Sequence, residues 1–159
     1  MSFLNSEITE KIRTLIGLYP ARQAVTLPAL HLVQDHYRCV PQAAIRDIAA
    51  LLEVSPAEVH DTMSFYGFYK TEANPLGKNR LWVCRSLACE LRGSEKVLEK
   101  IVQKLQVHPG QTTANGAITL EEAECIGVCE GAPCVLINDV PCSNVSLENV
   151  EKILDNLQK

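Results

Sequence analysis

The apolar residues between residues 6 and 70 follow the pattern of short amphipathic helices. They recur three or four positions apart in three groups: Ile8, Ile12, Leu15 and Ile16; Leu30 and Val33; and Ile45, Ile48, Ala49 and Leu52. This spacing places each group on one face of a helix. The motif SPAE at residues 55–58 predicts a further helix start, because Ser55 can cap the helix and Glu58 can complete a capping box. We therefore expect an N-terminal helical bundle.

The pattern changes after the segment TEANPLGKN, residues 71–79, which is rich in turn-forming residues. We interpret this segment as a domain boundary. It separates a helical module over residues 1–74 from a second domain over residues 75–159.

The second domain alternates predicted strands and helices. The predicted elements are a strand at 80–83, an amphipathic helix at 93–105, two strands around an Asn115-Gly116 turn within 112–125, a strand and turn at 134–142, and a last helix opening at Ser146. This order fits a small α/β sandwich of the thioredoxin type better than an all-α fold. The predicted fold class is therefore α+β, with a helical bundle followed by a thioredoxin-like sandwich.

Composition and charge narrow the function classes. The chain has 159 residues, 47% of them hydrophobic, and a formal net charge of -4, with a pI near 5.6. An acidic chain without a Lys/Arg run is not expected to bind nucleic acid. The longest apolar stretch, residues 48–52, is too short for direct membrane insertion. The first residues do not resemble an export signal, so we expect a cytoplasmic protein, peripheral to a membrane only through a complex.

Four of the seven cysteines form two closely spaced pairs, Cys84 and Cys89 as C-x4-C and Cys125 and Cys129 as C-x3-C. Two such loops can supply four thiolates to one centre, as iron-sulfur clusters and structural zinc both require. Zinc sites of this kind usually use C-x2-C, whereas longer loops suit a wider 2Fe-2S cluster. A cytoplasmic setting disfavours disulfides, and a thioredoxin redox pair needs C-x-x-C. Spacing favours the cluster and leaves a zinc-stabilised interaction module as an alternative.

The other three cysteines are Cys39, Cys134 and Cys142. A single cysteine in a helical or strand pattern is typically a small buried hydrophobe, which is our interpretation of Cys39 and Cys142. Cys134 stands close to the second pair, so spacing leaves it open as a substitute ligand.

Three segments together resemble the small thioredoxin-like 2Fe-2S subunit of NADH:quinone oxidoreductase, complex I. They are VHDTMSFYGFY at 59–69, VCRSLACELRGSEKVLEKI at 83–101, and VHPGQTTANGAITLEEAECIGVCEGAPCVLIND at 107–139. The resemblance implies that Cys84, Cys89, Cys125 and Cys129 hold one 2Fe-2S cluster. The family often has an apolar residue at the position of Cys134, which favours a packing role there.

The resemblance also implies a function and a partner. The subunit carries electrons beside a larger flavoprotein subunit that binds FMN and NADH. Similar subunits occur in NAD-dependent formate dehydrogenases and in NAD-reducing or bifurcating hydrogenases, and a free-standing ferredoxin is a further alternative. This chain has no nucleotide-binding fingerprint, so FMN and NADH are expected only on the partner. We assign no catalytic residue.

Charges near the predicted ligands bear on the potential of the cluster. Three acids and one base adjoin the cysteines: Glu90, Glu124 and Glu130, and Arg85. An oxidised centre with four thiolates carries a formal charge of about -2, so each acid should lower its potential, by on the order of 10 mV. N–H groups of Gly127 and Gly131, if directed at sulfur, would oppose this effect.

The segment TMSFYGFY, residues 62–69, concentrates aromatic residues in a chain with 5% of them. We expect Phe65 and Tyr66 to pack within the helical bundle or against the second domain. The alternative is that this segment clamps the flavoprotein subunit, because aromatic residues anchor interfaces well.

Overall fold

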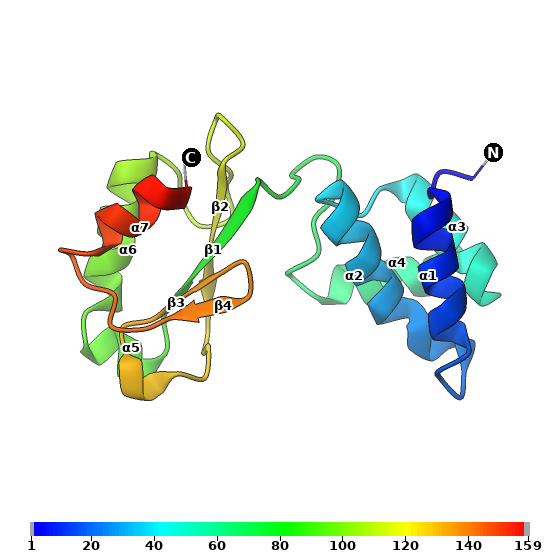
Figure 1. Ribbon diagram of the computed structural model, residues 1–159, viewed down its shortest axis with the longest axis horizontal. Helices are drawn as coiled ribbons and strands as arrows, with labels where there is room; N and C mark the ends of the chain where they lie inside the picture. The colour runs from blue at the N-terminus through cyan, green and yellow to red at the C-terminus, as the bar shows by residue number, and fades with distance from the viewer. Residues whose placement is uncertain (1, 158–159) are drawn as a thin grey trace. The chain divides into compact units, whose positions relative to one another are not determined.

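The computed structural model describes residues 2–157 and divides into two compact units, one ending at Pro75 and the other beginning at Leu76 (Figure 1). The sequence placed the boundary after residue 74. That residues 1–74 and 75–159 are independently folding domains stays a prediction. Within residues 2–157, no helix has both the length and the apolar character that crossing a bilayer requires.

The first unit is helical, and its elements are α1 (Ser6–Ile16), the short 3-10 helix η1 (Arg22–Val25), α2 (Thr26–Tyr37), α3 (Gln42–Leu52) and α4 (Pro56–Phe65). The expected apolar faces form its core, in which Ile12, Leu30 and Ile48 are fully buried. The capping box at the start of α4 is present: the Glu58 N–H donates to the Ser55 hydroxyl and the Ser55 N–H to the Glu58 carboxylate. The predicted helical bundle is confirmed.

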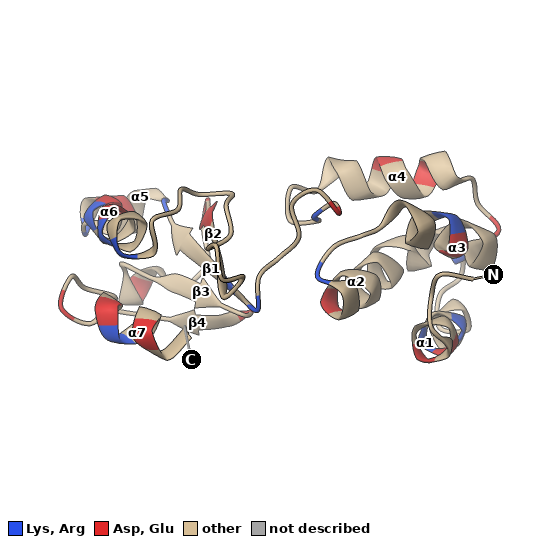
Figure 2. Cartoon of the chain, turned by 90° about the horizontal axis from the view of Figure 1, so that it is seen from above, with Lys and Arg blue, Asp and Glu red and all other residues tan. Residues whose placement is uncertain are grey.

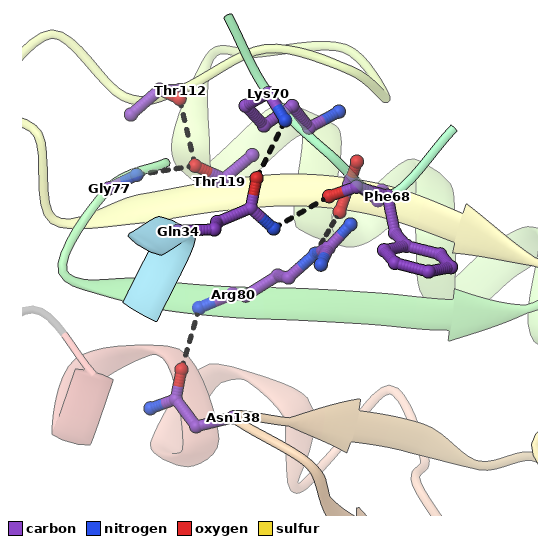
Figure 3. A network of polar contacts seen from close by, with 9 residues as sticks. Gln34, Phe68, Lys70, Gly77, Arg80, Thr112, Thr119 and Asn138 are labelled. Carbon is purple, nitrogen blue, oxygen red and sulfur yellow. Dashed lines mark hydrogen bonds and ion pairs between the residues drawn. The ribbon is translucent and has the colours of Figure 1, made fainter. Parts of the chain in front are cut away.

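Buried polar side chains hold the segment that follows α4. The Gln34 amide donates to the Phe68 carbonyl at 2.9 Å and accepts from the Lys70 N–H at 2.6 Å (Figure 3). The Tyr69 hydroxyl donates to the Leu27 carbonyl at 3.1 Å. Burial of this phenol raises its pKa to about 12. These bonds satisfy groups that would be costly to bury unpaired.

The aromatic residues of residues 62–69 divide between core and surface. Tyr66 and Phe68 pack against the core of the first unit. Phe65 is 80% exposed, so the expectation that it packs within the helical bundle is wrong. Packing against the second domain stays a prediction. Phe65 is the last residue of α4, and the side chain lies on the solvent side, opposite the face that buries Val59 and Met63.

The second unit contains a mixed four-stranded sheet with helices packed against it (Figure 1). Its elements are β1 (Asn79–Cys84), α5 (Leu87–Leu91), α6 (Ser94–Leu105), β2 (Ile118–Ala123), the 3-10 helix η2 (Cys129–Gly131), β3 (Val135–Ile137), β4 (Val140–Cys142) and α7 (Val150–Leu157). The strand order is β2-β1-β3-β4, with β1 and β2 parallel and the other neighbours antiparallel. The predicted α+β class is confirmed.

The core of the second unit lies between the sheet and the two longest helices of that unit. Strand residues such as Leu81 and Leu120 pack with Ile101 of α6 and Leu154 of α7. At the surface, Lys100 pairs with Glu151 at 2.6 Å and Lys104 with Asp155 at 3.1 Å, which links α6 to α7. Figure 2 shows that both helices carry basic and acidic residues. These exposed pairs add little stability, so the apolar core holds the helices against the sheet.

Residues 112–125 and the start of the last helix differ from the prediction. Residues 112–125 form one regular strand, β2, and only an isolated bridge from Thr112 to Thr119 on the other side of the turn. The last helix begins at Val150 instead of Ser146. The Ser146 hydroxyl accepts from the Glu148 and Asn149 N–H groups at 3.3 Å, which forms a capping turn ahead of the helix.

Hydroxyl and amide side chains fix the start of β1. The Thr119 hydroxyl accepts from the Gly77 N–H at 2.7 Å and lies 2.8 Å from the Thr112 hydroxyl. The Arg80 N–H donates to the Asn138 side chain at 2.8 Å (Figure 3). These bonds hold the register of β1 relative to its neighbours, and the cysteine loops begin where β1 and β2 end.

Residues 75–159 expressed alone are expected to fold, because this unit has its own buried core. We expect a single cooperative thermal transition, followed by far-ultraviolet circular dichroism, with a helix and strand content matching that of residues 75–157 in the full chain. The matched control is residues 1–74, whose helices enclose a separate core. A fragment 75–159 that melts without a cooperative transition would contradict the predicted domain division.

Candidate metal centre

Five of the seven cysteines gather at one edge of the sheet. Cys84 is the last residue of β1, and its partner in the parallel strand β2 is Ala123, so Cys125 follows just beyond the same edge. Strand β3 runs antiparallel to β1 with Val83 opposite Val135, so Cys134 precedes β3 at that edge too. Parallel strands end, and an antiparallel strand begins, at the same side of a sheet. The topology therefore brings together cysteines that are up to fifty residues apart in the sequence.

The inner group consists of Cys84, Cys89 and Cys134, whose sulfur atoms all lie within 4.8 Å of one another. Each of the three is only 1% exposed. Cys89 comes from α5, the short helix directly after the Cys84 loop, and its Sγ is 3.5 Å from the Sγ of Cys134. The sequence favoured a packing role for Cys134. The structure buries it as expected and also brings its sulfur to a predicted ligand.

The outer pair consists of Cys125 and Cys129, which are both exposed. Their Sγ atoms lie 3.9 Å apart. Cys125 follows β2, and Cys129 opens η2, so the loop between them turns the second sulfur back toward the first. The five cysteines thus form a buried inner group and a solvent-facing outer pair.

Two glycines allow the loop around the outer pair to fold. Gly127 has φ +86°, a backbone conformation that residues with a Cβ rarely adopt. At Gly131 a Cβ would lie 2.5 Å from the Cβ of Ser143, so only glycine permits this close approach. The Gly131 N–H donates to the Val128 carbonyl at 3.0 Å. The possibility that this N–H points at sulfur is therefore wrong.

Burial and hydrogen bonding shift the thiol pKa values in opposite directions. Burial by itself would raise the pKa of Cys84, but N–H groups of Ser86 and Ile126 directed at its sulfur, with the neighbouring thiols, bring the pKa below its ordinary value. Burial raises the pKa of Cys89, and the proximity of Cys84 adds to the effect. Cys84 is therefore the inner thiol most readily deprotonated, as a metal ligand must be.

The outer and inner cysteines are close enough to influence one another. The pKa of Cys129 is raised, mainly by hydrogen bonding to and the charge of Cys125, and to a smaller extent by the charges of Cys89 and Cys84. Metal binding would remove this mutual repulsion, because a cation offsets the negative charge of the thiolates.

An ion pair joins the two ligand loops. The Arg85 guanidinium donates from Nε to the Glu124 carboxylate at 3.0 Å. This contact lowers the pKa of Glu124 and raises that of Arg85. Arg85 directly follows Cys84, and Glu124 directly precedes Cys125. The charge of Glu124 is therefore balanced by a cation that lies equally near the cysteines.

The donor set fits an iron-sulfur centre. In a tetrahedral site with metal–sulfur bonds of about 2.3 Å, two sulfurs on one ion lie about 3.8 Å apart. The outer pair, at 3.9 Å, matches this spacing, and the inner sulfurs lie within 4.8 Å. Soft thiolate ligands select iron-sulfur clusters, zinc or copper(I). Two pairs of thiolates, one pair on each iron, are what a 2Fe-2S cluster requires.

The other two cysteines belong to other parts of the chain. Cys39 is buried in the first unit and Cys142 lies in β4, packed against the core of the second unit. Both placements agree with the expected packing role. Burial, together with the nearby charge of Glu72, raises the pKa of Cys39.

A surface feature that the sequence did not indicate adjoins the centre. Leu87 and Leu91, one on each side of Cys89 in α5, are 71% and 79% exposed. An open groove of about 600 Å³ is lined by Leu91, Pro133 and Leu147 among others. Nothing in the sequence indicates that these leucines are exposed. They lie in the segment that was interpreted for its cysteines, and no periodicity there distinguishes surface leucines from core leucines.

Comparison with known proteins gives the family. Residues 12–158 match the family described as thioredoxin-like [2Fe-2S] ferredoxin. The chain is 31% identical to a subunit of the NADH-quinone oxidoreductase of Rhizobium meliloti (strain 1021), over 94% of this chain and 88% of that protein. It is 35% identical to a subunit of the NADH-quinone oxidoreductase of Thermus thermophilus, over 77% and 68% respectively.

A solved structure shares the fold. The crystal structure of an NAD+-reducing [NiFe]-hydrogenase in the air-oxidized state aligns with 84% of this chain and 22% of that chain, with a TM-score of 0.74 and 21% identity. The comparisons confirm the resemblance that the motifs indicated and the predicted cofactor, one 2Fe-2S cluster. The chain belongs to the thioredoxin-like [2Fe-2S] ferredoxin family.

Proposed function

We propose that this protein is the electron-carrying subunit of an NADH:quinone oxidoreductase. The observation that carries the proposal is the match to relatives named as subunits of that enzyme, which extends over both compact units of the chain. A free-standing ferredoxin would not need the helical unit. The proposed role is that of a carrier rather than a catalyst, and the grouped thiols support it, because thiolates hold the kind of cluster that carries electrons.

Cys84 and Cys89 are the proposed ligands of one iron, and Cys125 and Cys129 those of the other. When bound, a 2Fe-2S cluster supplies a one-electron carrier. The protein contributes a dry inner side, where Cys84 and Cys89 are 1% exposed, and an exposed outer pair. N–H groups of Ser86 and Ile126 favour the thiolate form of Cys84. Cys134 is not needed to complete the set of four.

The proposed partner is a larger flavoprotein subunit that binds FMN and NADH. Leu87 and Leu91 lie four residues apart, so they share one face of α5. Exposed leucines of this kind mark a docking surface when they adjoin a functional site. Docking there would bring the partner next to Cys89 and exclude water from the centre. Phe65, exposed at the end of α4, is a second candidate anchor for the same partner.

Ligand assignment is tested by single cysteine substitutions in the full chain. Cys125→Ala and Cys129→Ala are expected to lose the cluster, because no third thiol is grouped with the outer pair to replace the lost one. Among residues 2–157, the only group of three potential metal ligands within 4.8 Å of one another is the inner one. Cys134→Ala is expected to keep the cluster. Iron and acid-labile sulfide should fall from about two of each per chain to near zero in the first two variants only. Zinc in place of iron in the wild-type protein, or loss of the cluster from Cys134→Ala, would contradict the assignment.

Partner docking is tested by the double substitution Leu87→Asp and Leu91→Asp. Two charges in a desolvated contact should weaken binding to the flavoprotein subunit by about tenfold or more. The measurement is the dissociation constant by calorimetry, with iron content as the check on the site. Val140→Asp is the matched control, since Val140 is 65% exposed on β4. Equal affinity of the double variant and the control would remove α5 from the interface.

Charge near the ligands is tested by Glu124→Gln and Glu130→Gln together. Removal of each negative charge favours the reduced cluster, so the midpoint potential should rise by on the order of 10 mV for each exposed acid. Part of the rise in midpoint potential comes from Arg85, because its positive charge is no longer balanced by Glu124. Glu99→Gln, an exposed acid of α6 outside both cysteine loops, is the control. An unchanged or lower midpoint in a potentiometric titration would refute the effect.

A further inference from the structure

Cys134 is a fifth thiol at a site that needs four. Its sulfur lies 3.5 Å from that of Cys89 and within 4.8 Å of that of Cys84. A cysteine that only filled space in the core would not need to direct its sulfur at two metal ligands. The Cys134 side chain is 1% exposed, so its sulfur and those of Cys84 and Cys89 share one buried environment.

The backbone holds Cys134 in this position. Its carbonyl accepts from the Cys84 N–H at 3.2 Å, which continues the pairing of β1 with β3 beyond the last paired strand residues. On the C-terminal side, Val135 is fixed in the sheet opposite Val83. The carbonyl of Pro133, on the other side, accepts from the Val145 N–H at 2.9 Å. The thiol therefore has a defined place beside Cys84 and Cys89.

After a replacement of Cys89, the inner iron would be held by Cys84 and Cys134, whose sulfurs lie within 4.8 Å of each other. About 3.8 Å separates two sulfurs of a tetrahedral metal site, so a small shift of either side chain brings this pair to the required spacing. The Cys134 sulfur is also only 3.5 Å from the Cys89 sulfur, the position that it would take over. Cys134 also offers the same donor atom as the residue that it would replace.

We propose that Cys134 is a reserve ligand, able to take the place of Cys89 on the inner iron. This inference rests on the proposed ligand set. In the exchange, the iron–sulfur bond to Cys89 would break and Cys89 would leave as a thiolate. The proton of the Cys134 thiol would pass to that thiolate, 3.5 Å away, and the Cys134 thiolate would form the new bond to the same iron. One bond replaces another, and no electron is gained or lost.

The test compares full-length Cys89→Ala with the double variant Cys89→Ala/Cys134→Ala. Alanine is used because a serine oxygen could itself bind iron. We expect the single variant to keep most of its iron and acid-labile sulfide, with the visible and electron paramagnetic resonance spectra of an all-thiolate 2Fe-2S centre. The double variant should contain at least about tenfold less of both. Cys89→Ala/Cys142→Ala is the matched control, and it should behave like Cys89→Ala.

A second pair of variants makes the test independent of one substitution. All three inner sulfurs lie within 4.8 Å, so Cys84→Ala can be compared with Cys84→Ala/Cys134→Ala in the same way. Loss of the cluster from a folded Cys89→Ala variant, to the level of its double variant, overturns the reserve role. If Cys89→Ala does not fold, the Cys84 pair decides by the same comparison. Wild-type protein tests the proposed function separately: without a 2Fe-2S spectrum there, the proposed function fails, whereas a wild-type cluster that these single variants lose defeats only the inference about Cys134.

Discussion

The register of β1 between β2 and β3 is the constraint on which the centre depends. Cys84 ends β1, its parallel partner leads into the Cys125 loop, and its antiparallel neighbour begins after Cys134. The main-chain bonds continue past the paired residues, from the Arg85 N–H to the Ala123 carbonyl at 2.9 Å and from the Cys84 N–H to the Cys134 carbonyl at 3.2 Å. A slip by one residue would move every side chain of the strand to the other face. Sheet pairing thus sets where the loops that carry these cysteines begin and end.

The two sides of the centre differ in their contact with water. The inner cysteines are enclosed with Ala132 and with the side chains of Ile126 and Val128 packed against them, whereas Cys125 and Cys129 face solvent. Burial makes thiolates costly unless a cation or hydrogen bonds compensate. The inner side therefore depends on bound metal and on N–H donors. The outer side keeps solvent access, which a docked partner can close.

Much of the fold could be predicted because periodicity and caps are local signals. The helix of residues 56–65 followed from its capping box, and the two cysteine pairs followed from their spacing. The proximity of the Cys134 sulfur to Cys84 and Cys89 could not be predicted in this way. It depends on the pairing of β3 with β1, a strand about fifty residues earlier in the sequence. The solvent-facing side of Phe65 was missed for a related reason, since aromatic content indicates packing and does not indicate which face of α4 is covered.

The Arg85 to Glu124 contact shows which forces set the geometry of the ligand loops. It joins the residue after Cys84 to the residue before Cys125, so it could be taken for the clamp that holds the loops together. Both side chains are largely exposed, at 55% for Arg85 and 80% for Glu124, and exposed pairs of this kind add little stability and are screened by salt. The main-chain bonds at the end of β1 connect the same two loops from inside the sheet. Position is therefore governed by the backbone, and the ion pair acts mainly on the local charge that the centre experiences.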